Sequence, residues 1–203
     1  MISTRPSGSV WTPKLDGTEV LYVPLWHPKT RLSPFTSFDR NRHVMTNVGA
    51  IWGKYGRTFA GDDDSIRPAA NAAFAFTGGS VVAWINQTFS TELNRWVTDF
   101  RDVGNTTGYF YITSNTNTLT ASQGTHYVDL VATSTVPAGS WTMVAVLGIN
   151  MGNDGQAAIG DRGEHQVGNN MLGTIGEVWI YNSTISIGDL TRIYQATKWR
   201  YQS

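Results

Sequence analysis

The sequence contains no cysteine and few charged residues, and each scarcity excludes a class of protein. Without cysteine the chain has no disulfide framework, no thiolate zinc site and no thiol nucleophile. Charged residues make up 15% of the 203 positions, with fifteen basic residues against fifteen acidic ones. A nucleic-acid-binding surface normally carries a clear basic excess. We therefore expect no nucleic-acid partner.

Long apolar segments are also missing. The longest apolar run, residues 141–149, is much shorter than the ~20 residues that cross a bilayer. The first eight residues contain no apolar stretch typical of a signal-peptide core. We expect no membrane insertion and no cleaved leader, so a chain working outside a cell would leave by another route, such as release within a virion.

Short runs of β-branched and aromatic residues recur along the chain at intervals of about ten residues. The turns between them are rich in Gly, Asn and Asp, as at residues 104–105 and 153–155. This pattern predicts an all-β fold, a two-sheet antiparallel sandwich. The candidate strands cover residues 19–23, 43–48, 57–59, 80–86, 95–100, 108–113, 127–132, 140–147, 156–159 and 173–181.

Alternation within two of these strands predicts which side chains share a face. In residues 95–100, Trp96, Thr98 and Phe100 are expected on one face of the sheet. In residues 108–113, Tyr109 and Tyr111 are expected on one face, and Phe110 and Ile112 on the other.

A short helix is predicted at the C-terminal end. Ser186 can act as its N-cap, with Asp189 three residues later as the acidic partner of a capping box. Leu190, Ile193 and Tyr194 then follow the i, i+3, i+4 spacing of an apolar helix face.

The chain divides into an N-terminal arm, residues 1–18, and one domain, residues 19–203. The arm is polar, holds two prolines and lacks periodicity, with Val10 and Trp11 as its candidate anchor. A net charge of zero favours association, and aromatic residues are enriched at interfaces. We expect an assembly interface formed by Val10 and Trp11 together with Trp199 and Tyr201.

Four segments in order resemble the laminin-G-like, or concanavalin A-like, jelly-roll family, particularly its bacterial and phage branch. They are GAIWGKYGRTFAGDDDSI at residues 49–66, GSVVAWIN at 79–86, GSWTMVAV at 139–146, and residues 159–181 ending in GTIGEVWIY. The resemblance implies a two-sheet jelly roll closed by a short C-terminal helix. It also implies that Trp84, Trp141 and Trp179 occupy packing positions.

Members of this family often hold a structural calcium ion, and the resemblance makes Asp62, Asp63, Asp64 and Glu177 its candidate ligands here. Clustered carboxylates suit a hard cation. The alternative is a solvated loop in which the aspartates cap turns. Gly176 stands where the family has an acidic residue, which removes one candidate ligand.

The carboxylates do not form a recognisable catalytic pair. Glycosidases that share this sandwich use an E-x-D-x-x-E strand motif, and the four glutamates show no such spacing. Asp99 and Asp102 would fall on opposite faces of a continuing strand, whereas retaining hydrolysis needs two adjacent carboxyls. The four histidines are scattered, and no G-x-S-x-G motif occurs. We expect no enzymatic activity.

Aromatic residues are the feature best suited to carry a function. Sugar binding needs flat apolar faces beside polar groups that bind hydroxyls. The candidate set comprises Trp96, Tyr109, Tyr111, Arg95, Asn94 and His126. The alternative is that these rings fill the space between two sheets.

These features predict a non-catalytic structural or adhesion protein of a virion, such as a phage capsid decoration protein or a tail or fibre subunit. Its partners would be other virion proteins or copies of itself, with its loops at the virion surface. The alternative function is a lectin-like carbohydrate-binding module, and a glycan-cleaving enzyme is the less favoured third.

Overall fold

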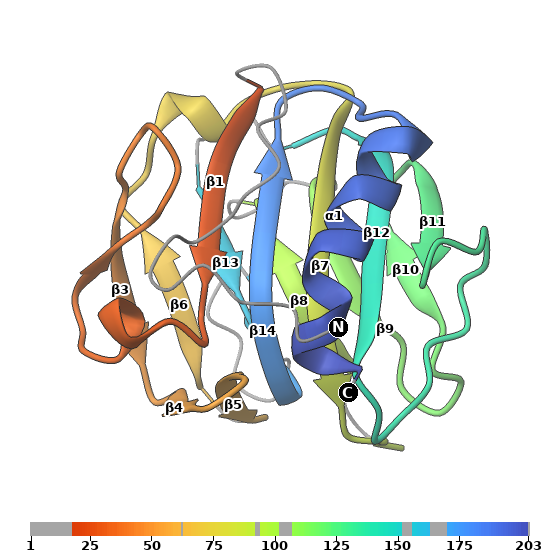
Figure 1. Cartoon of the computed structure of the whole chain (residues 1–203), viewed down its shortest axis with the longest axis horizontal. Coiled ribbons are helices and arrows are strands. Elements are labelled where there is room, and N and C mark those ends of the chain that lie inside the picture. The colour runs from red at the N-terminus through yellow and green to blue at the C-terminus, as the bar shows by residue number, and fades with distance from the viewer. Residues whose placement is uncertain are drawn as a thin grey trace, which may run out of the picture.

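The computed structural model describes residues 18–61, 63–91, 94–101, 107–151, 156–162 and 170–202. These residues form two antiparallel β-sheets packed face to face, with a helix on the outside of one sheet (Figure 1). The predicted all-β sandwich with a C-terminal helix is therefore confirmed. The arm anchors Val10 and Trp11 lie outside the described residues.

The first sheet, sheet A, is built around two long central strands. Its order is β11 (Thr125–Val128), β12 (Thr142–Ile149), β7 (Gly79–Gln87), β14 (Leu172–Tyr181), β5 (Gly56–Ala60) and β4 (Ile51–Gly53). A seventh strand, β1 (Glu19–Pro24), pairs with the C-terminal half of β14, while β5 pairs with its N-terminal half.

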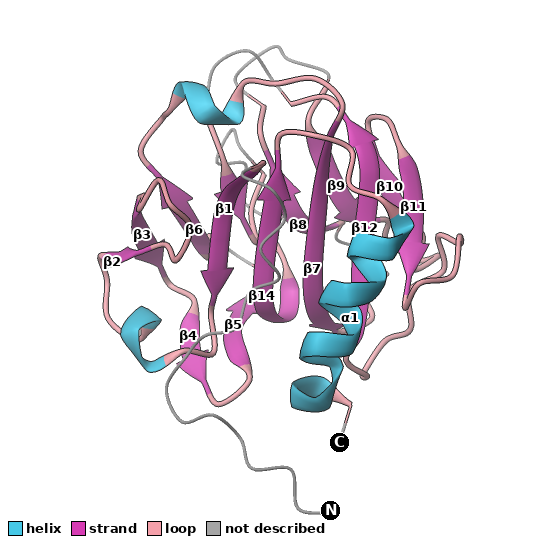
Figure 2. Cartoon of the chain, turned by 45° about the horizontal axis from the view of Figure 1, so that its top comes forward, coloured by secondary structure: helices cyan, strands magenta, loops and turns pink. Residues whose placement is uncertain are grey.

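The second sheet, sheet B, forms the opposite layer. Its order is β10 (Leu119–Ala121), β9 (Tyr109–Ile112), β8 (Arg95–Asp99), β13 (Ala158–Ile159), β6 (Ser65–Pro68), β3 (Val44–Val48) and β2 (Phe35–Thr36). Short 3-10 helices cover Pro28–Thr30 and Ala72–Phe74. Figure 2 shows sheet B behind sheet A, with the C-terminal helix on the near side.

The central strands of sheet A are buried on both faces, so the molecule has two apolar cores. One lies between the two sheets, and the other lies between sheet A and the helix. Val81 and Ile85 point into the core between the sheets. Val82 and Trp84, which alternate with them, point into a second core under the helix, where Trp179 also lies. Trp84 and Trp179 are packing residues as predicted, but they fill the layer between sheet A and the helix.

The helix α1 (Ile187–Tyr201) begins at the predicted capping box. The Ser186 hydroxyl accepts a hydrogen bond from the Asp189 N–H at 3.1 Å, and the Asp189 carboxylate accepts one from the Ser186 N–H at 3.2 Å. Leu190 and Ile193 are fully buried against sheet A. Among the described residues, no helix is long and apolar enough to span a membrane.

The last turn of α1 corrects part of the predicted assembly interface. Tyr201 is 6% exposed because its ring packs between Trp84 and Trp141, at centroid distances of 4.8 and 4.7 Å. It belongs to the core of its own chain and is not available to a partner. Trp199, by contrast, is 47% exposed.

Two predicted strands are shorter than expected. The strand predicted over 127–132 ends at Val128, because Asp129 and Leu130 adopt positive φ angles of 45° and 71° and form a two-residue turn. In the segment predicted over 156–159, the strand is limited to Ala158–Ile159.

Candidate functional site

Three of the predicted aromatic residues gather on the outer face of sheet B. Trp96 comes from β8, and Tyr109 and Tyr111 come from β9. The Trp96 ring lies 4.6 Å from that of Tyr111 and 6.1 Å from that of Tyr109. The three rings belong to neither apolar core, whereas Phe110 and Ile112 point inward. We call these three residues the aromatic cluster.

A β-bulge in β8 separates Trp96 from the residues that were expected to share its face. Trp96 pairs with Tyr111, but the next pair along the strand is Thr98 with Phe110, so Val97 is an extra residue. A bulge of this kind reverses the alternation of side chains beyond it. The prediction that Trp96, Thr98 and Phe100 share a face is therefore wrong, since Phe100 lies in the core between the sheets.

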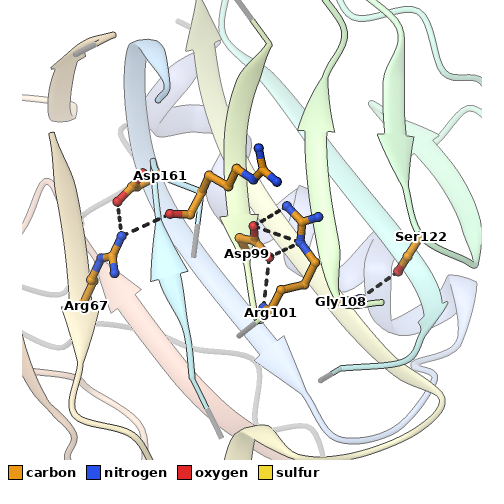
Figure 3. A network of polar contacts seen from close by, with 7 residues as sticks. Arg67, Asp99, Arg101, Gly108, Ser122 and Asp161 are labelled. Carbon is orange, nitrogen blue, oxygen red and sulfur yellow. Dashed lines mark hydrogen bonds and ion pairs between the residues drawn. The ribbon is translucent and has the colours of Figure 1, made fainter. Parts of the chain in front are cut away.

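An arginine lies over the aromatic cluster. The Arg101 guanidinium is 4.7 Å from the centroid of Trp96 and 4.9 Å from that of Tyr109. It is held there by the buried Asp99 carboxylate, with Nε–Oδ1 at 2.9 Å and Nη2–Oδ2 at 2.7 Å (Figure 3). The Arg162 guanidinium also approaches Trp96, at 5.9 Å.

This cover decides which rings are accessible. Trp96 is only 5% exposed, whereas Tyr109 and Tyr111 are partly exposed. The two tyrosines present the accessible ring surface, and Trp96 supports them from the side. Burial raises the pKa of the Tyr111 hydroxyl above its ordinary value.

Hydroxyl groups border the aromatic cluster on β10. Thr120 pairs with Tyr111, so its side chain lies on the same outer face. Its Oγ1 is 2.9 Å from that of Thr113, and the Ser122 hydroxyl accepts a hydrogen bond from the Gly108 N–H at 2.9 Å.

On the side of β8 away from β9, sheet B carries a second arginine–aspartate pair beside a hollow. Arg67 of β6 forms an ion pair with Asp161 and donates a hydrogen bond to the Arg162 carbonyl at 3.1 Å. Figure 3 shows this pair and the Asp99–Arg101 pair on neighbouring parts of the sheet. The hollow has a volume of about 250 Å³ and is lined by Arg67, Pro68, Ala70, Gln156, Ala157 and Ala158.

Arg95 and Asn94, predicted to contact sugar, instead support the turn between β9 and β10. The fully buried Arg95 donates to the Thr113 carbonyl at 2.7 Å and to the Asn117 side chain at 3.2 Å. Asn94 accepts a hydrogen bond from the Ser114 N–H at 3.0 Å. Both residues position the strand that carries the tyrosines.

His126 is not brought to the aromatic cluster. It lies on β11 at the edge of sheet A, paired with Val146, which faces the core between the sheets. Partners on adjacent strands share a face, so His126 is directed toward the inter-sheet space. Burial there lowers its pKa.

The predicted calcium ligands are not brought together either. Asp64 is buried and its carboxylate accepts the Ala60 N–H at 2.7 Å, while Asp63 is exposed and Asp62 lies outside the described residues. Glu177 lies under α1, where it accepts a hydrogen bond from the Tyr22 hydroxyl at 2.9 Å and pairs with Arg200. In the part of the chain that the structure describes, no three Asp, Glu or His side chains group as a metal site would require.

Sequence reasoning missed Asp99, Arg101 and Arg162 as neighbours of the aromatic cluster. Asp99 was expected on the face opposite Trp96, and the bulge at Val97 places it on the same face. Arg101 follows the strand and reaches back over the rings through its ion pair with Asp99. No local pattern in the sequence indicates this contact.

Comparisons with known proteins place the fold but not a sequence family. No family model matches the chain, and no curated protein matches it. Solved structures do match. Domain 4 of an extracellular GH43 arabinanase from Geobacillus stearothermophilus, in complex with arabinotriose, aligns with a TM-score of 0.55 and 15% identity, over 87% of this chain and 98% of that one.

Two further structures align with larger proteins. The ligand binding domain of botulinum neurotoxin serotype D, in complex with N-acetylneuraminic acid, has a TM-score of 0.62 at 9% identity, over 89% of this chain and 51% of that one. A Trypanosoma rangeli sialidase has a TM-score of 0.57 at 11% identity, over 92% and 34%. The chain thus spans about half and a third of their lengths. Its fold is a β-sandwich like those of concanavalin A-like and lectin domains.

Proposed function

We propose that this chain is a non-catalytic carbohydrate-binding module whose ligand lies on the outer face of sheet B. The observation that carries the proposal is the aromatic cluster, which lies outside both apolar cores. Tyr109 and Tyr111 offer flat ring surfaces to the C–H groups of a sugar. Thr120 lies beside them as a partly exposed polar group for its hydroxyls, and the buried Arg101, paired with Asp99, holds Tyr109 in place.

The comparisons support this function. The arabinanase domain carries arabinotriose and the neurotoxin domain carries N-acetylneuraminic acid. Ligand binding by proteins with the same fold does not transfer to this chain by itself, so the aromatic cluster remains the main argument. The role as a virion surface subunit stays a prediction, since neither the fold nor these comparisons bear on it.

The absence of catalysis is part of the proposal, and the state of the carboxylates supports it. A retaining glycosidase needs two carboxyl groups about 5–5.5 Å apart, one of them free to attack. On the outer face of sheet B, the described carboxylates of Asp99 and Asp161 are buried and each faces an arginine. Such carboxylates are poorly placed to act as a nucleophile or an acid.

A glycan array tests the proposal. Wild-type protein should bind one or more glycans saturably, and Tyr111→Ala should weaken that binding about tenfold or more, the equivalent of about 1.4 kcal/mol. Tyr55→Ala is the matched control, because Tyr55 is an exposed tyrosine in the turn between β4 and β5, on sheet A. It should bind like the wild type.

Circular dichroism and thermal melting establish that each variant is folded before its affinity is interpreted. Equal loss of binding in Tyr111→Ala and Tyr55→Ala would contradict the assignment of the site to sheet B. A folded wild-type protein that binds no glycan on a broad array would contradict the function itself.

A further inference from the structure

We propose that the hollow beside Arg67 is a second sugar subsite, so that the ligand is a chain of at least three sugar units crossing sheet B perpendicular to its strands. This inference rests on the proposed function and specifies the class of glycan.

The register places the hollow in line with the tyrosines. Ala158 pairs with Asp99, and Asp99 pairs with Tyr109, so these three residues lie side by side on β13, β8 and β9. Ile159 pairs with Ile66, which puts the preceding Ala158 beside Arg67 of β6. Cross-strand neighbours share a face of the sheet. Arg67, Ala158, Asp99 and Tyr109 therefore form one row on the outer face.

The small side chain of Ala158 forms part of the wall of the hollow. Larger groups stand on both sides of it, the Arg67–Asp161 pair and the Asp99–Arg101 pair, which Figure 3 shows from close by. The depression of about 250 Å³ lies beside Arg67 and Ala158 and is also lined by Pro68, Ala70, Gln156 and Ala157. This volume is slightly below the range of pockets for drug-sized ligands, roughly 300–1,000 Å³, and suits a single sugar ring.

The length of the row requires an oligosaccharide. Three steps between neighbouring strands separate β6 from β9, or about 14 Å at the ~4.8 Å spacing of a sheet. One sugar ring cannot reach from the hollow to the tyrosines over that distance. A unit over Tyr109 and Tyr111, a unit in the hollow and a unit between them, over the Arg162 side chain that runs from beside Arg67 to within 5.9 Å of the Trp96 ring, would fill the row.

The experiment uses linear arabino-, xylo-, cello- and chito-oligosaccharides of one to six units, with affinities measured by calorimetry. For the series that binds, the trisaccharide should bind wild-type protein about tenfold or more tightly than the monosaccharide. Ala70→Trp should fill the hollow and weaken binding of three or more units about tenfold, with little effect on the disaccharide. Ala70 is exposed and lines the hollow, so the substitution leaves both cores intact.

The adjacent Ala69 is also exposed but does not line the hollow, and Ala69→Trp is the matched control. It should bind every length like the wild type. If Tyr111→Ala abolishes binding but Ala70→Trp binds all lengths as the wild type does, the second subsite is wrong and the proposed function stands. If folded wild-type protein binds neither these series nor any glycan of the array, both are wrong.

Discussion

Glu19 shows how one position can couple folding to pH. This residue opens β1, and its burial together with the nearby Asp39 raises the pKa of its carboxyl from 4.5 to about 7. Between these two values the folded chain keeps a proton that the unfolded chain releases. The resulting stabilisation is complete below pH 4.5, decreases as the pH rises, and is lost once the pH passes about 7.

The variant Glu19→Gln tests this coupling, because glutamine has no proton to release. Above pH 7 it should be more stable than the wild type by about 1–2 kcal/mol, a figure that allows for partial screening by solvent. Below pH 4.5 the two proteins should have the same free energy of unfolding. Urea denaturation across this range provides the measurement, and a stability difference that does not change with pH would contradict the assignment.

The start of α1 is the part of the fold that the local sequence specifies most clearly. Ser186 and Asp189 exchange two hydrogen bonds with each other's backbone. Ser186→Ala should therefore lower the free energy of unfolding by about 1 kcal/mol. Gly188→Ala should raise it by about 0.5 kcal/mol, because alanine favours helix and the added methyl would meet its nearest neighbour, the Ser186 hydroxyl oxygen, at 3.5 Å.

Thermal melting of both variants checks these opposite signs. The two residues lie in one exposed turn on the side of the molecule away from the aromatic cluster, so neither change should alter glycan affinity. Destabilisation by Gly188→Ala would contradict the helical geometry assigned to this turn.

Elements set by local pattern were predictable from the sequence, and those set by pairing were not. The capping box and the alternation of Tyr109 with Phe110 depend on neighbours along the chain, and both are found as predicted. The bulge at Val97 depends on how β8 pairs with β9, which no window of a single strand contains. For this reason the sequence indicated the three rings of the candidate site but missed Asp99 and Arg101.

At the scale of the whole molecule, the described residues form three layers, which are the helix α1, sheet A and sheet B. The helix covers one face of sheet A, and sheet B leaves its outer face to the proposed ligand (Figure 2). The sandwich and the helix were both predictable from periodicity. That Trp84 and Trp179 would lie beneath the helix was not predictable, because residues 81–85 of β7 are all apolar and the two faces of this segment look alike in sequence.

A buried ion pair fixes the outermost layer to the sheet. Glu177 of β14 is fully buried, and burial raises its pKa although Arg200 of α1 opposes the rise. The Arg200 guanidinium also lies 3.9 Å from the centroid of Trp26. Arg200→Ala should lower the free energy of unfolding by about 3–5 kcal/mol, since it leaves a buried carboxylate without its positively charged partner.

Arg192→Ala is the matched control on the same helix, because it removes an exposed ion pair with Asp189 and should cost less than about 1 kcal/mol. Adding Glu177→Gln to Arg200→Ala should recover part of the loss. Chemical denaturation would measure all four proteins, and equal costs for the two arginine variants would contradict a structural role for the buried pair.

The tyrosines of the aromatic cluster extend from hydrogen-bonded strands, and Arg95 ties down the turn that follows them. Groups held in this way are ordered before any partner arrives. An incoming saccharide would then lose its own freedom but impose little on the protein. This surface should therefore bind its ligand with little change in its own conformation.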